Sequence, residues 1–276
     1  MHTLIIDTMN FAHRARVGMQ IGSHPIMFHF FRNLRALVGT HSPDNVVLAL
    51  EGHPKHRHKL MPEYKANRQI DDDDPEREAK IETSNHFFDS ITDCLNLIRV
   101  AFPITIIKHP FYEADDTIHN FAAELISSDG QNNVTISSSD TDFIQSVCPN
   151  IALYNPTQKK FIDAPDYDYV SWKALKGDGS DGIPGIPRVG AKTAEKLVRN
   201  GLKEYLENNN EAASLYSRNV ELIRFKTFDE NDWNEFMIHT GKPDWDVVKA
   251  SFNDHGFDSI TNDTSWKRFV STFDRT

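Results

Sequence analysis

Cysteine is nearly absent from the sequence, with only Cys94 and Cys148 among 276 residues. Two cysteines exclude a disulfide framework and offer no zinc-binding pattern, which favours a reducing compartment. Long hydrophobic runs are also missing, both as a membrane span and as a secretory leader at the start of the chain. We therefore expect a cytoplasmic protein that has no membrane segment and is stabilised by a large core.

Positive charge is in deficit. The chain has 30 Lys and Arg against 40 Asp and Glu, which gives a formal net charge of -10. Taken alone, this balance argues against a nucleic-acid partner, because phosphates attract cations. Residues 55–68 break the pattern: they contain Lys55, Arg57, Lys59, Lys65 and Arg68 against the single acid Glu63. The sequence therefore holds a basic segment inside an acidic whole, and both features need a cause.

What is present is an alternation of strand and helix patterns. Helical spacing is clearest at residues 81–98 and 118–126, and it returns in the segment that ends at Gly177. This alternation predicts an α/β fold with a mainly parallel sheet covered by helices on both faces. The apolar runs typical of its strands lie at residues 3–7, 45–51, 104–107, 133–140 and 151–154.

From about residue 183 the pattern changes to glycine and proline punctuation, with short helices expected after Ala191 and Gly201. This is typical of a helix-hairpin-helix element, whose backbone N–H groups at a helix N-terminus bind an anion such as phosphate. We expect two domains. Residues 1–182 form the sheet domain, and residues 183–276 form the hairpin element and a helical subdomain.

Acidic side chains follow several of the predicted strands. A single acid at a helix start needs no function, since Asp and Glu favour that position. Nine acids along one sheet edge would repel one another or take up protons unless cations lay between them. Mg²⁺ prefers carboxylate ligands, and two such ions catalyse phosphodiester hydrolysis. The nine are Asp7, Glu51, Glu113, Asp115, Asp116, Asp140, Asp142, Asp178 and Asp181.

Six motifs occur in a fixed order over about residues 1–226: "LIIDTMNFAHRA", "MPEYKANR", "YEADD", "SSDTD", "GDGSDGIPGIPRVGAKTA" and "LYSRNVELIRF". As an ordered set they resemble the flap endonucleases and 5′–3′ exonucleases of bacteriophages and of the N-terminal domains of bacterial DNA polymerases. The resemblance implies a PIN-like nuclease with a helical arch at about residues 52–80. It also implies that the hairpin is a helix-two-turn-helix element that binds duplex DNA.

The resemblance assigns the acids to two ions, Mg²⁺ or Mn²⁺. Asp7, Glu113, Asp115 and Asp140 belong mainly to the tighter metal cluster; Asp142, Asp178 and Asp181 surround the second ion, and Asp116 is accessory. Glu51 departs from the family, which usually has Asp in a pattern like FDG where this chain has "LEG". The extra methylene shifts the carboxylate, which bears on metal affinity and on the choice between the two metals.

The resemblance also implies residues that contact DNA. Lys65 and Arg68 would contact the scissile phosphate, Arg14 and Asn10 would lie near the 5′ strand, and Tyr64 would either stack on a base or have a structural role. In the hairpin, Gly185, Gly190, Lys192 and Thr193 would hold a duplex phosphate together with a K⁺ ion bound by turn carbonyls. We interpret "GHPKHRHK" as a mobile basic loop, and we expect the arch to be partly disordered without DNA.

We therefore expect a divalent-metal-dependent, structure-specific 5′ nuclease. Its substrates would be branched or nicked duplex DNA with 5′ ends and RNA–DNA primer junctions, and its context DNA replication with replication proteins as partners. The enzyme would be a stand-alone monomer of bacteriophage origin, active in the host cytoplasm. Two alternatives remain: a nucleic-acid-binding homologue that lost its chemistry through Glu51, and a PIN-type ribonuclease.

Overall fold

The computed structural model describes residues 1–17 and 24–274 as a mixed α/β protein built on a seven-stranded sheet. The strand order is β6-β5-β4-β1-β2-β3-β7, and the inner strands run parallel. The predicted mainly parallel sheet is therefore confirmed. The parallel strands are β1 (His2–Asp7), β2 (Asn45–Leu50), β3 (Thr105–Lys108), β4 (Asn133–Ser137) and β5 (Ile151–Asn155).

Two antiparallel strands form the edges of the sheet, and the sequence analysis predicted neither. β6 (Lys160–Ile162) pairs with β5, and β7 (Met237–Thr240) pairs with β3. β6 is only three residues long, and every side chain of β7 is exposed. Neither strand therefore carries the buried alternation by which a strand is recognised in a sequence.

The two faces of the sheet bury separate cores, because successive strand residues point to opposite sides. Leu4 and Ile6 contribute to one core and Ile5 to the other. The second core lies under α5 (Ala114–Ser128) and the short helix η3 (Thr141–Ser146). The first core is covered by α1 (Thr8–His13), α2 (Pro25–His41), α4 (Arg77–Ala101), α11 (Trp245–Asp254), α12 (Asp258–Thr261) and α13 (Asp263–Phe273).

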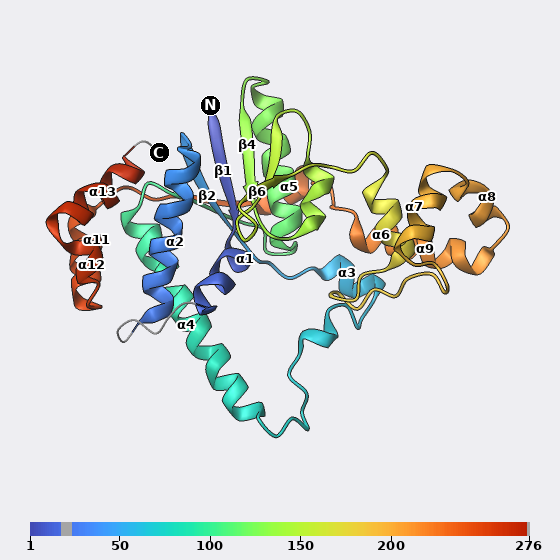
Figure 1. The fold of residues 1–276 in the computed structure, drawn as a ribbon, viewed down its shortest axis with the longest axis horizontal. Coiled ribbons are helices and arrows are strands. Elements are labelled where there is room, and N and C mark those ends of the chain that lie inside the picture. Colours follow the sequence, from blue (N-terminus) through green and yellow to red (C-terminus); the bar gives the residue numbers. More distant parts are fainter. Residues whose placement is uncertain (18–23, 275–276) are drawn as a thin grey trace.

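The hairpin region forms a small body of its own around α6 (Tyr169–Lys176). Its helices are α7 (Ala191–Arg199), α8 (Leu202–Glu207) and α9 (Asn210–Ile223), which share an apolar cluster with α6. In Figure 1 this body lies at the opposite end of the molecule from α11, α12 and α13. Among the described helices, none has the length and hydropathy needed to cross a membrane.

The chain after the hairpin returns to the sheet, where its last helices pack. A short helix α10 (Glu230–Glu235) leads into β7, and α11 to α13 then pack beside α2 and α4. Phe252 and Phe269 are fully buried in that core. The apolar faces of α11, α12 and α13 thus pack in the first core.

The chain between α3 (Lys55–Leu60) and α4 projects from the body of the molecule, where the sequence predicts an arch (Figure 1). A short helix η2 (Ala66–Arg68) lies at its start. The mobile basic loop predicted for "GHPKHRHK" is wrong for residues 55–60, which form α3. Arg57 of this helix is 2% exposed, and its hydrogen bonds tie α3 to the interior.

Gly52 brings β2 close to the loop before α5. Its N–H donates to the carbonyl oxygen of Tyr112 at 3.0 Å. A Cβ atom at this position would lie 2.0 Å from the carbonyl oxygen of His109 and 2.4 Å from that of Tyr112. This close approach holds Glu51, at the end of β2, beside Glu113, at the start of α5.

We expect Gly52→Ala to lower the free energy of unfolding by about 2 kcal/mol or more, because the new methyl group collides with backbone atoms. Gly130→Ala is the matched control, since nothing lies within 4 Å of its Cβ position; its effect should stay within about 0.5 kcal/mol. Urea unfolding measures both. Equal stability of the two variants would contradict the close approach.

Candidate active site

Acidic side chains gather at one edge of the sheet, where the parallel strands end. Asp7 is the last residue of β1, Glu51 directly follows β2, and Asp140 follows β4. Glu113 and Asp115 lie at the start of α5, after the loop from β3. The carboxyl ends of parallel strands open at one edge of a sheet, and the negative charges of the other four acids all act on Asp115.

Burial and mutual repulsion change the protonation of these acids. Burial, followed by the charge of Asp140, raises the pKa of Asp7 to about 6. Burial, followed by repulsion from Glu113 and Asp7, raises the pKa of Glu51 to about 7. The pKa of Asp115 is raised well above its ordinary value by burial and by the surrounding carboxylates. The cations of the chain near Asp7, Glu51 and Asp115 therefore do not balance the negative charge of these acids.

Asp7 is positioned by two hydrogen bonds. Its Oδ1 accepts from the backbone N–H of Asn10 at 3.1 Å, and its Oδ2 accepts from the hydroxyl of Ser138 at 2.8 Å. The side chain of Asn10 pairs with Ser139, accepting from its backbone N–H at 3.0 Å and donating to its hydroxyl at 2.8 Å. Asn10, which the sequence predicts near the 5′ strand, thus ties α1 to the loop that carries Asp140.

A second group of acids surrounds Lys173 of α6. The Lys173 ammonium group bonds to Asp142 and lies 2.6 Å from Asp178. Burial raises the pKa of Asp142 to about 6, against the opposing effect of Lys173 and with a further contribution from Asp140. Burial also acts on Asp178, but the bonds from Lys173 and Ser180 outweigh it and lower the pKa of this acid. The charge of Asp140 thus acts on both groups.

The base of the arch brings positive charge to the acids. Lys65 bonds to Glu113 and lies 3.8 Å from Asp181, and Arg68 bonds to Asp181. The hydroxyl of Tyr64 donates to Glu113 at 3.0 Å and to Asp181 at 3.1 Å. The ring of Tyr64 is only 4% exposed, so it offers no face to a base in this arrangement. Of the two roles left open for Tyr64, the geometry favours the structural one.

The carboxylate of Asp116, an accessory acid in the predicted metal site, is occupied by other partners in this structure. It is fully buried and accepts from Nη1 and Nη2 of Arg57 at 2.5 and 2.9 Å and from the Lys226 N–H at 2.9 Å. Arg57 also donates to Glu113 at 2.8 Å and to the Leu222 carbonyl oxygen at 2.9 Å. Because these donors occupy its carboxylate, we assign Asp116 to the anchoring of α3 on α5.

The donor set fits a hard divalent cation, because it consists of carboxylate oxygens with too little positive charge between them. Lys65 and Lys173 each already bridge two of the acids. The pocket between the acids measures about 10 Å³, room for about one water. Within residues 1–17 and 24–274, no three His, Cys, Asp or Glu side chains form a ready metal-binding group. A metal ion would therefore replace part of the charge that the lysines now supply.

Two predicted DNA contacts lie outside this pocket. Arg14 is half-buried and donates to the carbonyl oxygen of Pro156 at 3.2 Å. Gly185 packs against the end of α6, where an added Cβ would lie 2.1 Å from the carbonyl oxygen of Lys176. In this structure the observed reason for a glycine at residue 185 is therefore the close packing of two backbone segments.

The other predicted hairpin residues lie at the N-terminus of α7. Gly190 is the N-cap residue, with open space where a Cβ would stand. Lys192 and Thr193 follow in the first turn, and both are exposed. Free space, exposed N–H groups and a nearby ammonium are suited to an anion.

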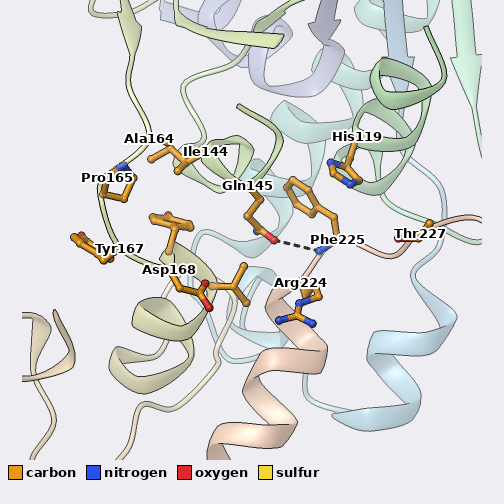
Figure 2. Close-up of a pocket in the computed structure, with 12 residues that line it drawn as sticks. His119, Ile144, Gln145, Ala164, Pro165, Tyr167, Asp168, Arg224, Phe225 and Thr227 are labelled. Carbon is orange, nitrogen blue, oxygen red and sulfur yellow. Dashed lines mark hydrogen bonds between the residues drawn. The ribbon is translucent and has the colours of Figure 1, made fainter. Parts of the chain in front are cut away.

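A wider cavity of about 380 Å³ lies beside the acidic pocket, next to η3 and α6. Figure 2 shows Tyr167 on the segment before α6, across this cavity from His119 and Phe225. One polar side chain of this cavity already has a hydrogen-bond partner, since Gln145 accepts from the Phe225 N–H at 3.3 Å. None of the nine predicted metal-binding acids lines it, which separates it from the acidic pocket.

The sequence analysis missed Arg57 and Lys173 as residues of the site. Arg57 lies in the basic segment, but its composition does not distinguish it from the exposed Lys55 and Lys59. Lys173 could have been recognised from the sequence, because it lies within "VSWKAL" among apolar residues on a helix. A lysine on a buried face requires an acidic partner, and Asp178 follows within two turns.

Comparisons with known proteins identify the family of the chain. Residues 2–171 match the protein family described as 5′–3′ exonuclease, N-terminal resolvase-like domain. A flap endonuclease Xni of Edwardsiella ictaluri is 28% identical over 213 residues, covering 72% of this chain and 76% of that protein. A DNA polymerase I of Synechocystis is 31% identical over 193 residues, 63% of this chain but only 18% of the polymerase.

The fold is also found among solved structures. A bacteriophage T5 flap endonuclease, crystallised with DNA and metal ions, superposes with a TM-score of 0.64 at 19% sequence identity. The alignment covers 99% of this chain and 100% of the phage protein. At this level of identity the likeness concerns the fold, and it includes the arch segment, the hairpin body and the C-terminal helices.

We expect Arg57→Ala to lower the free energy of unfolding by about 3–5 kcal/mol, because it leaves the buried Asp116 carboxylate without its partner. Lys59→Ala on the same helix is the control; the side chain is exposed, and its loss should cost less than about 0.5 kcal/mol. Urea unfolding checks both variants. A similar small effect for both would show that the buried ion pair does not anchor the arch.

A second prediction concerns pH. The folded pKa of Glu51, about 7, lies above its ordinary 4.5, so protonation stabilises the fold below pH 4.5, and this stability is lost as pH rises to about 7. In a chelating buffer, Glu51→Gln should remove part of that loss, since its amide oxygen still accepts from the Ala114 N–H. Unfolding curves from pH 5 to 8 test this, and parallel pH dependence in both proteins would contradict it.

Proposed function

The chain belongs to the 5′–3′ exonuclease family, and from this premise we propose that it is a structure-specific 5′ nuclease acting on DNA. The observation that carries the proposal is the meeting of unbalanced acids at the sheet edge with the cations of the arch base. A phosphodiester brings negative charge to such a site only if further cations accompany it. Metal-dependent phosphodiester hydrolysis is the chemistry that these groups suit best.

Two ions, Mg²⁺ or Mn²⁺, complete the proposed site. Asp7, Glu51, Glu113, Asp115 and Asp140 would hold the first, and Asp142, Asp178 and Asp181 the second. When bound, the pair would activate a water and stabilise the charge on the leaving oxygen. The flap endonuclease of bacteriophage T5, crystallised with metal ions, supports this assignment by its fold.

The protein's own residues position the substrate. Lys65 and Arg68 at the arch base would exchange their carboxylate partners for phosphoryl oxygens and stabilise charge that develops there. The polar interactions of Lys65 are with the acids that would hold metal. With those acids engaged by a metal ion, the Lys65 ammonium group would be available to the substrate.

The hairpin would hold the duplex. The N–H groups after Gly190, with Lys192 and Thr193, suit a backbone phosphate, and we include a K⁺ ion bound by turn carbonyls in the proposal. Phosphate contacts position DNA without reading its sequence. The selectivity we propose is therefore for DNA structure, namely 5′ flaps, nicks and the RNA–DNA primer junctions of replication. In this proposal the protein acts as a monomer in the cytoplasm, together with replication proteins.

Glu51 does not favour the alternative of a binding protein without chemistry. Its carboxylate lies close enough to Glu113 and Asp7 for their charges to raise its pKa. Its Oε2 accepts from the Ala114 N–H at 3.0 Å, which fixes the longer side chain beside the other acids. The extra methylene therefore leaves the carboxylate within the cluster.

We expect Asp140→Asn and Asp181→Asn each to reduce cleavage by at least about 100-fold, because each removes a charge that holds metal. DNA binding should remain within a few-fold of wild type. Asp93→Asn, an exposed acid-to-amide change on α4, is the control and should retain full activity. The measurement is product length from 5′-labelled flap, nicked and RNA-primed duplexes during titration with Mg²⁺ and Mn²⁺.

The assay separates the candidate functions. Undiminished turnover in both Asp variants would contradict the site assignment. No cleavage by wild type in either metal would favour a binding protein, and cleavage of RNA without cleavage of DNA flaps would favour a ribonuclease.

A further inference from the structure

A cleft with an aromatic wall opens next to the acidic pocket. It measures about 440 Å³, within the roughly 300–1,000 Å³ typical of small-molecule sites. Tyr167, Tyr169 and Trp172 line it, and so do Asp140 and Asp178 of the acidic site. The cleft therefore shares a wall with the groups that we propose to cleave DNA.

The aromatic rings are held in place before any ligand arrives. The ring centroids of Tyr169 and Trp172 are 5.6 Å apart, and those of Tyr167 and Trp172 are 6.1 Å apart. The Tyr169 hydroxyl donates to Asp142 at 3.1 Å, and Nε1 of Trp172 donates to the Ala191 carbonyl oxygen of α7 at 3.0 Å. All three side chains remain half-exposed. A ligand would meet an ordered surface, which lowers the entropy cost of binding.

Positive charge accompanies the rings. The Lys176 ammonium lies 4.6 Å from the centroid of the Trp172 ring. The Arg199 guanidinium lies 5.2 Å from that of Tyr167 but is paired with Asp166 and Glu195, so Lys176 is the cation that a ligand would meet. Lys176 is exposed and lines the cleft. Aromatic faces combined with cations are the usual composition of sites for single-stranded nucleic acid, because bases stack and phosphates need counter-charge.

We propose that this cleft binds one unpaired nucleotide of the cleaved strand, with its base against Tyr167 and Trp172 and its phosphate toward Lys176. The proposal rests on the nuclease function proposed above and adds a subsite to it. The position of the cleft supports a nucleotide of the cleaved strand as its ligand. Asp140 and Asp178 connect the cleft to the acidic pocket, and the Trp172 bond to Ala191 connects it to the hairpin. The bound nucleotide therefore lies between the cleavage site and the held duplex.

The test is a double-mutant cycle, in which one partner carries a protein substitution and the other carries a modified DNA nucleotide. Flap duplexes carry a single abasic nucleotide at each position flanking the junction in turn, and their affinity is measured with Ca²⁺ as the only divalent ion. Tyr167→Ala should weaken binding of the intact flap about tenfold, the loss typical of one stacked base. At one abasic position the same substitution should cost nothing further. Tyr167→Phe should bind as wild type does.

Two further measurements keep the test independent of folding effects. Phe161→Ala removes an exposed ring outside the cleft and should leave affinity unchanged. Lys176→Gln, at an exposed position, should weaken binding about threefold and lower the salt dependence by about one phosphate contact. In wild type, 2-aminopurine at the sensitive position should lose fluorescence on binding as it stacks.

The outcomes separate the two proposals. Cleavage of flaps by wild type, with Tyr167→Ala and Lys176→Gln both binding as wild type does, would overturn the cleft proposal and leave the nuclease proposal intact. An equal loss for Tyr167→Ala at every abasic position would also overturn it, since the ring would then act through the fold. If wild type neither binds nor cleaves flap DNA, the nuclease proposal fails, and the subsite fails with it.

Discussion

Repulsion between neighbouring carboxylates is the constraint on which the rest of this structure depends. Parallel strands bring Asp7, Glu51 and Asp140 to one edge of the sheet, and α5 adds Glu113 and Asp115. Such a group is stable only if other parts of the chain bring positive charge to it. Lys173 arrives from the hairpin body, and Lys65 and Arg68 arrive from the arch base. The acids thus explain why distant segments of the chain meet at this edge.

The cations that form ion pairs with these acids are of two kinds, which differ in the solvent exposure of their side chains. Arg57 is buried, and each of its partners is fixed, so it holds the arch base to α5 permanently. Arg68 is largely exposed, with 54% of its side chain accessible, so its ion pair is weak and easily exchanged. The base of the arch at Arg57 is therefore rigid. Arg68, eleven residues further along, is available to a substrate.

Much of this arrangement was predictable from the sequence. Buried strands followed by acids are visible as apolar runs that end in Asp or Glu, and the sheet they form is mainly parallel, as expected. The edge strands β6 and β7 were not predictable, because their side chains are mostly exposed. The ion pair of Asp116 with Arg57 was not predictable either, because neighbouring helical acids such as Asp115 and Asp116 look alike in sequence. The roles of Arg57 and Lys173 depend on contacts between segments 56 and 31 residues apart.

The return of the chain to the first core has a consequence for synthesis. Val248, Phe252, Phe269 and Phe273 pack against helices formed by the first hundred residues, so that core stays incomplete while the ribosome still holds the last thirty. Large apolar surfaces left open during translation are prone to aggregate. Loss of residues 248–273 would uncover the apolar faces of α2 and α4 in the same way.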